Sequence, residues 1–230
     1  MEEKKEPYGS DEKIVEIELE RLRSFEKHPF KVTEDGQMME LQESIQKYGI
    51  LNPLIVRPRP EGVYEIISGH RRKFAAEKIG YRKVPVIIRM LNDDEAVISM
   101  VDSNLQREMI RPSEKAFAYK MKLDAMKRQG IRTDLTLSQN ETKLRSDEVL
   151  SKQVGESRAQ VQRFVRLTEL IPELLDLVDN KKLQFTVAVN ISYIDKEVQG
   201  WIYEYISDTG FIKPKQIAAL RNQLNDGPIN

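Results

Sequence analysis

Two adjacent arginines beside a glycine, at the start of a helix-forming stretch, are the residues of this sequence with the clearest chemical potential. An apolar run ends at Ser68-Gly69, and Arg71 and Arg72 follow almost directly. Glycine permits a tight turn and a close backbone approach to a ligand because it has no Cβ atom. The first N–H groups of a helix lack intrahelical partners, and guanidinium groups add forked donors that suit phosphate oxygens. The pattern predicts a strand, a glycine turn and a basic helix start that hold an anion, which we expect to be a phosphate.

A second interpretation of the same residues requires no ligand. An exposed helix start with two solvated arginines would have the same sequence, and a single Gly-x-Arg-Arg pattern has low specificity. On these residues alone, the two interpretations stay open.

A second group of candidate residues follows a glycine turn in the C-terminal half of the chain. Two short helix-forming segments flank the turn at 154–156, which is typical of a helix-turn-helix. The second segment, residues 157–167, contains no acidic residue although the whole chain is electrically neutral. Arginine can read guanine edges or grip phosphates and glutamine can pair with adenine, so the pattern favours DNA binding over an ordinary helical hairpin with a solvated basic face. The candidate DNA-contacting residues are Ser157, Arg158, Gln160, Gln162, Arg163 and Arg166.

The elements that must position these residues differ in type between the two halves of the chain. The first hundred residues alternate short β-rich runs with helical patterns, which predicts a small α+β domain. Beyond Arg111 the strand signal nearly disappears, and the rest is expected to be all-helical. Strands are expected at 14–19, 53–56, 63–67 and 84–88, and helices at 38–48, 70–80, 93–105, 112–129, 146–154, 157–167, 172–178, 186–193, 196–207 and 214–224.

Local signals refine this outline. Ser113 is expected to be the N-cap of its helix, and the polar residues 130–145 an exposed loop. Trp201 and Tyr205 are expected to be core residues. We predict a flexible tail at 1–13, an α+β domain at 14–110 and a helical domain at 111–230, with the helix-turn-helix at 146–167.

Composition narrows the possible classes of function. The chain has no cysteine and only two histidines, so disulfides, thiolate chemistry and a histidine-built metal centre are not expected. No apolar run approaches the ~20 residues of a membrane span, and a reducing, cytoplasmic location without a membrane partner is expected. Lys+Arg and Asp+Glu balance at 37 each, so only local clusters can indicate a nucleic-acid partner.

Four segments in order resemble the ParB family of chromosome and plasmid partition proteins. They are residues 48–57, the arginine box 68–76, residues 102–108, and 112–116 with the helix-turn-helix that ends at Leu167. The similarity covers roughly residues 17–220. It implies a ParB/sulfiredoxin-like α+β nucleotide-binding domain followed by an all-α helix-turn-helix domain.

The resemblance also implies ligands and partners. A family member binds a centromere-like site on double-stranded DNA as a homodimer, uses CTP as a clamp switch and works with a ParA-type ATPase, which implies a nucleoid-associated protein. Asn104 is the residue expected to reach Mg²⁺, which normally accompanies a triphosphate. The CTP-binding residues that the resemblance implies are Ser68, Gly69, His70, Arg71, Arg72, Asn104 and Arg107.

Two departures from the family pattern bear on catalysis. His70 and Ser103 stand where the family usually has glutamate, and the glutamate at the second position is tied to metal handling and hydrolysis. We therefore expect CTP binding with slow or absent turnover, and a relative of the plasmid or mobile-element type. Two alternatives stay open: a helix-turn-helix transcriptional regulator with a vestigial nucleotide pocket, and a ParB-like nuclease that uses the adjacent Asp93, Asp94 and Glu95.

Overall fold

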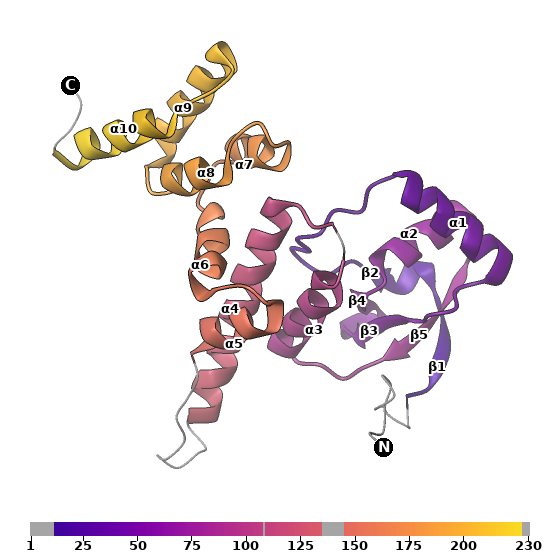
Figure 1. Cartoon of the computed structure of the whole chain (residues 1–230). Helices are drawn as coiled ribbons and strands as arrows, with labels where there is room; N and C mark the ends of the chain where they lie inside the picture. Colours follow the sequence, from indigo (N-terminus) through magenta and orange to yellow (C-terminus); the bar gives the residue numbers. More distant parts are fainter. Residues whose placement is uncertain (1–11, 108, 135–144, 227–230) are drawn as a thin grey trace, which may run out of the picture. The chain divides into compact units, whose positions relative to one another are not determined.

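The structure is a computed structural model that describes residues 12–107, 109–134 and 145–226. The chain divides into two compact units, Met1–Gln106 and Arg107–Asn230 (Figure 1). The first unit contains all the strands of the described residues, and the second is helical. The predicted fold class, an α+β domain followed by an all-α helix-turn-helix domain, is confirmed. The predicted tail at 1–13 lies almost wholly outside the described residues.

The sheet of the first unit has five strands in the order β1-β5-β3-β4-β2. β1 (Ile14–Glu18) is antiparallel to β5 (Lys83–Ile88), and β3 (Leu54–Pro58) is antiparallel to β4 (Tyr64–Ser68). β3 is parallel to β5, and the two-residue β2 (Leu22–Arg23) is parallel to β4. β2 escaped prediction because so short a strand shows no alternation of hydrophobic residues. The core on this sheet includes Ile17, Leu54, Val56, Ile66, Val84 and Val86.

The helices of the first unit begin and end at recognisable signals. Asp35 caps α1 by accepting a hydrogen bond from the Met38 N–H, and Gly49 ends the helix at φ 73°. α3 opens with a capping box in which Asn92 and Glu95 bond to each other's backbone N–H. α1 and α2 lie side by side, as Figure 1 also shows. The elements are α1 (Gly36–Tyr48), α2 (His70–Lys78), α3 (Asp93–Leu105) and two 3₁₀ turns, η1 (Leu19–Arg21) and η2 (Pro60–Gly62).

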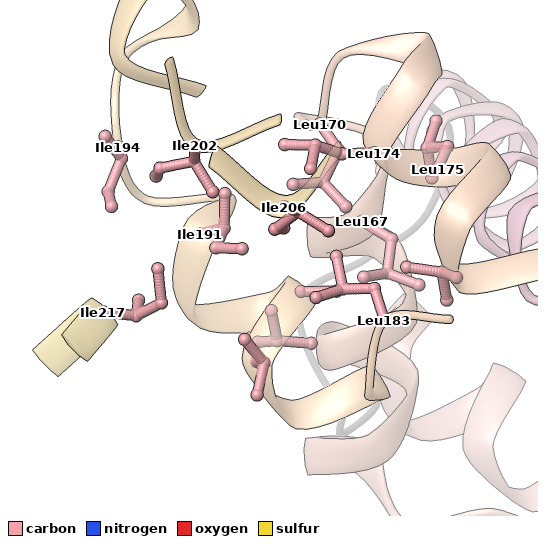
Figure 2. Packing of buried hydrophobic residues seen from close by; sticks show 14 of the residues in the cluster. Leu167, Leu170, Leu174, Leu175, Leu183, Ile191, Ile194, Ile202, Ile206 and Ile217 are labelled. Atoms are coloured by element: carbon pink, nitrogen blue, oxygen red, sulfur yellow. The ribbon is translucent and has the colours of Figure 1, made fainter. Parts of the chain in front are cut away.

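The second unit packs its helices around an aliphatic core. Figure 2 shows Leu167, Leu170, Leu174 and Ile206 directed into this cluster, which holds the helix-turn-helix to the helices that follow it. Apolar burial of this kind is the main stabilising contribution to a helical unit. The helices are α4 (Pro112–Asp134), α5 (Ser146–Val154), α6 (Arg158–Leu167), α7 (Pro172–Asp179), α8 (Phe185–Ile191), α9 (Lys196–Thr209) and α10 (Pro214–Asp226).

Three local expectations in this unit are wrong. Ser113 is not an N-cap, because α4 already begins at Pro112; the Ser113 N–H and hydroxyl instead both donate to the Asp179 carboxylate at the end of α7. α4 continues through Gly130, since a single glycine can be tolerated inside a helix. The rest of the expected loop, residues 135–144, lies outside the described residues. Trp201 and Tyr205 are exposed rather than buried.

Candidate nucleotide and DNA sites

The turn between β4 and α2 requires glycine at position 69. Gly69 has φ 105° and ψ 20°, a left-handed conformation that side chains with a Cβ atom rarely adopt. A Cβ atom there would lie 2.8 Å from Cγ of Leu54, a fully buried residue of β3. The turn therefore packs directly on the sheet, and α2 starts beside it with its positive dipole end. Ser68, the last residue of β4, is partly buried at the same turn.

Arg72 connects this turn to the loop between α1 and β3. Its Nη1 atom donates to the Pro53 carbonyl at 2.8 Å and also to the Asn52 carbonyl. Asn52 and Pro53 belong to the first of the sequence segments that resemble ParB. One guanidinium group thus links two of the four segments that resemble the ParB family, residues 48–57 and 68–76. This contact could not be predicted from residue types, because the acceptors are backbone carbonyls.

Arg71 and His70 also make contacts with residues outside α2. Arg71 Nη2 lies 3.1 Å from Oδ1 of Asp35. A hydrogen bond from Thr33, the backbone bond from Met38 and the Arg71 charge hold the pKa of Asp35 below its ordinary value. His70 is buried, and its Nε2 atom accepts a hydrogen bond from the Phe25 N–H at 3.3 Å.

The His70 ring also lies against a second histidine. The centroids of its ring and the ring of His28 are 3.8 Å apart. His70 therefore packs against the 25–30 segment. The position at which the sequence resemblance implies glutamate is thus occupied here by a buried aromatic contact.

The predicted residues at the end of α3 are less open than the sequence indicated. Asn104 is 4 % exposed, and its amide donates to the Met100 carbonyl at 2.8 Å. The Ser103 hydroxyl donates to the same carbonyl at 2.9 Å. This contact uses the amide nitrogen of Asn104 and not the side-chain oxygen, which is the atom that Mg²⁺ would need. Arg107, in the segment 102–108 that resembles ParB, is the first residue of the second unit, whereas Asn104 belongs to the first.

The three consecutive carboxylates that raised a nuclease hypothesis serve different purposes. Asp93 lies 2.8 Å from Nη1 of Arg57 and 3.3 Å from Arg59, and these contacts hold the pKa of Asp93 below its ordinary value. Asp94 is buried, and Glu95 belongs to the capping box of α3. Within the described part of the chain, no group of three or more His, Asp or Glu side chains is placed to hold a metal ion.

In the second unit, α5 and α6 form the predicted helix-turn-helix with the expected bounds. Gly155 adopts the left-handed conformation at φ 68°, which ends α5 and turns the chain. The ammonium group of Lys115, on α4, pairs with the Glu156 carboxylate of this turn and lies 4.7 Å from the centroid of the Phe164 ring. The Ser157 hydroxyl accepts from the Gln160 N–H at 3.1 Å and so caps α6. Ser157 therefore has a structural task at the helix start.

Asp147, on the first turn of α5, contacts two of the candidate DNA-binding residues. Its Oδ2 atom accepts from Arg158 Nε at 2.6 Å and from Gln162 Nε2 at 3.3 Å, and Arg145 lies 3.5 Å from Oδ1. Burial opposes ionisation of Asp147, but the Arg158 hydrogen bond and the charges of Arg158 and Arg145 outweigh it and lower its pKa. Asp147 lies in the helix predicted at 146–154, but an acid eleven residues before an arginine gives no signal of a contact.

The outer face of α6 borders a cleft formed with α4. The cleft has a volume of about 550 Å³. Arg166 lies at its edge, donates to the Ser192 carbonyl and stacks 4.2 Å from the centroid of the Tyr193 ring. Among the residues that the structure describes, none bonds to the exposed Arg163 guanidinium. The lining residues include the cations Lys120, Lys127, Arg163 and Arg166 and the carboxylates Asp124 and Glu169.

The fold and these two sites define a class: a two-unit protein with a helix-turn-helix and an α+β unit whose glycine turn opens a basic helix. Residues 3–105 match the family described as the ParB N-terminal domain, and residues 134–223 match the ParB HTH domain. The chain is 30 % identical over 215 residues to the chromosome-partitioning protein Spo0J of Thermus thermophilus, with 94 % of this chain and 72 % of that protein covered. The chain therefore belongs to the ParB family.

Further comparisons agree with this assignment. A chromosome 1-partitioning protein ParB of Deinococcus radiodurans is also 30 % identical over 215 residues, with 94 % of this chain and 68 % of that protein covered. The C-terminally truncated ParB of Caulobacter crescentus, solved in complex with the centromeric parS site, shares the fold with a TM-score of 0.51. It is 24 % identical, and the superposition covers 91 % of this chain and 99 % of that one.

None of the helices in the described part of the chain has the length and hydrophobicity of a membrane span.

Proposed function

We propose that this protein binds a centromere-like site on double-stranded DNA as a partition protein of the ParB type. The observation that carries the proposal is α6, a helix of ten residues with three arginines and no acid, which a glycine turn presents after α5. Arg163 and Gln160 are the candidates for base contacts in the major groove. Arg158 and Gln162 act from the same helix, with Ser157 fixing its start and Arg166 beside a neighbouring aromatic ring.

The first unit would bind a nucleoside triphosphate at the α2 turn, and family resemblance makes this nucleotide CTP with Mg²⁺. The geometry that supports it is the glycine turn on the sheet, the start of α2, and Arg71 and Arg72 on its first turn. A phosphate could accept hydrogen bonds from the first N–H groups of α2. Ser68, His70, Asn104 and Arg107 complete the proposed set. The domain limits 14–110 and 111–230, the homodimer on DNA, the ParA-type ATPase partner and nucleoid association belong to the same proposal.

DNA binding is tested by fluorescence anisotropy with a labelled parS duplex and a scrambled duplex of equal length. Arg163→Ala should weaken binding to the specific duplex by about 1–3 kcal/mol, because it removes a donor to a base edge or phosphate. Binding should also weaken as salt rises, since phosphate contacts release counterions. Lys182→Ala, which removes one exposed cation outside the helix-turn-helix, is the matched control. Equal affinity of the wild-type protein for both duplexes would show that it does not recognise the parS sequence specifically.

Nucleotide binding is tested separately by calorimetry with CTP, ATP, GTP and UTP in the presence of Mg²⁺. Saturable binding of CTP alone is the expected result, and Arg72→Ala should weaken it. Phosphate release, with and without DNA, then measures turnover.

One observation favours a second function for the first unit. Asn104 is buried and bonded to the Met100 carbonyl, and the neighbouring Ser103 carries no charge. If no metal-bound triphosphate occupies this unit, the unit would be a scaffold for a helix-turn-helix regulator. Specific DNA binding together with no binding of any triphosphate would identify that function.

A further inference from the structure

The outer face of α9 carries two large aromatic side chains that are exposed to solvent. Trp201, the chain's only tryptophan, is 57 % exposed, and Tyr205, one turn further on, is 43 % exposed. Tryptophan and tyrosine are enriched at the centres of protein interfaces, where their large surfaces are removed from water. An exposed pair of them on one helix face therefore marks a candidate contact surface.

The opposite face of α9 explains why this pair is not in the core. Ile202 and Ile206 are 4 % and 5 % exposed, and Figure 2 shows both in the aliphatic cluster, with Ile206 near Leu170 and Leu174. Successive residues of a helix are about 100° apart around its axis. Because Ile202 and Ile206 face the core, Trp201 lies on the solvent side of α9. Gln216 on α10 donates to the Tyr205 hydroxyl at 3.0 Å, which holds that side chain in place. The exposed face thus belongs to a well-anchored helix.

The same face is acidic. Glu197, Glu204 and Asp208 are exposed, and their spacing of seven and four residues places them in one stripe with Trp201 and Tyr205. The sequence from 197 to 212 contains no lysine or arginine. Lys196, at the start of the helix, donates its ammonium hydrogen to the Glu169 carbonyl instead.

A glycine inside α9 adds an independent feature beside Trp201. Gly200 is helical, and a Cβ atom built there would meet nothing within 4 Å. Glycine is a poor helix former, and no atom of the described residues lies close enough to require it here. It leaves a notch on the stripe through which the backbone of a partner could approach closely.

We propose that the acidic stripe of α9, formed by Glu197, Gly200, Trp201, Glu204, Tyr205 and Asp208, binds a cationic segment of a partner protein. Arginine or lysine side chains would lie on the two aromatic rings and bond to the carboxylates. DNA is excluded as the ligand of this stripe, because the three carboxylates would repel its phosphates. A second copy that docked through the same stripe would oppose like charges. The stripe is about 16 Å long, which suits a three-turn helix and a transient contact.

The single tryptophan allows a site-specific test on the full chain, independent of the proposed DNA site. The probe is a twelve-residue synthetic peptide with arginine at every third or fourth position and alanine elsewhere. The expected result is a saturable change in Trp201 emission, with no change for the same peptide carrying glutamate in place of arginine. The triple variant Glu197→Gln, Glu204→Gln, Asp208→Asn should bind at least tenfold more weakly. The double variant Glu173→Gln, Asp176→Asn, which neutralises exposed carboxylates on α7, should bind like the wild type.

Trp201→Ala is examined with a fluorescently labelled peptide, and circular dichroism confirms that each variant is folded. Since Trp201 is exposed, this variant should fold and bind at least tenfold more weakly. The proposal is overturned if no saturable signal occurs, or if the α7 variant loses as much affinity as the α9 variant. It is also overturned if sedimentation shows self-association that Trp201→Ala abolishes, because the occupant would then be a second copy.

Discussion

Asp147→Asn tests most directly whether Asp147 positions the side chains of α6 that are proposed to bind DNA. Asp147 is nearly buried, with a side chain 10 % exposed, whereas its partner Arg158 is 48 % exposed. A hydrogen bond between charged groups contributes about 1.5–3 kcal/mol when shielded, but exposed pairs contribute under ~1 kcal/mol. Because Arg158 is half exposed, we expect the variant to lose about 1 kcal/mol of unfolding free energy near pH 7.

The pH dependence of this contribution follows from the lowered pKa of Asp147. The carboxylate is favoured in the folded state, so its stabilisation is present above the unfolded pKa of about 3.9 and is lost as the pH falls through the lower folded value. The difference in unfolding free energy between wild type and variant should therefore be constant near neutrality and shrink below about pH 4. Urea titrations at several pH values measure it.

The effect on DNA separates a positioning role from simple repulsion. If Asp147 holds Arg158 and Gln162 in the orientation for reading bases, Asp147→Asn should weaken binding to the specific duplex about tenfold, or ~1.4 kcal/mol. Binding to scrambled DNA should not weaken, because a negative charge has been removed. Glu148→Gln, one residue away and paired with Lys152, is the control for charge alone. An equal gain in affinity for both duplexes would refute the reasoning and make Asp147 an electrostatic brake.

Three further substitutions address the first unit. Arg72→Ala should weaken triphosphate binding at least tenfold by calorimetry, and should also lower stability because the Asn52 and Pro53 carbonyls lose their donor. Gly69→Ala should lower the unfolding free energy by about 2 kcal/mol in urea titrations, since a Cβ atom would clash with Leu54 at a positive φ. Ser103→Glu should raise phosphate release from CTP if a missing carboxylate limits turnover; unchanged release in a folded, CTP-binding variant would place the defect elsewhere.

The sequence allowed good predictions where local signals and burial patterns act together. The helix at 93–105 and the helix-turn-helix at 146–167 have the predicted bounds, because caps and glycines mark their ends. Ser113 was wrongly predicted as an N-cap. Serine is typical of the N-cap and proline of the first helical position, and here Pro112 marks the start of the helix. Trp201 was mispredicted because hydrophobicity alone does not say which face of a helix is covered.

The side-chain contacts at the candidate sites could not be predicted, for a physical reason. Asp147 and Arg158 are eleven residues apart, and Arg71 lies 36 residues from Asp35. Such pairs depend on how elements fold together, whereas spacing in the sequence reports only contacts within one element. Residue types indicated the candidate sites, but the partners of each arginine follow only from the tertiary structure.

Those partners imply an order in which the arginines become available to an anionic ligand. Arg71 and Arg158 are held by carboxylates, so a phosphate must compete with an existing charge pair. Arg166 bonds to a neutral carbonyl, which is a weaker competitor than a phosphate for a guanidinium group. Arg163 lies exposed at the cleft and needs no contact broken. Arg163 should therefore make the first contact with DNA, while Arg158 contacts a base from the orientation that its pair with Asp147 gives it. In that case, the Asp147–Arg158 pair favours specific binding, in which Arg158 keeps this orientation, over non-specific binding, in which Arg158 would turn to a phosphate.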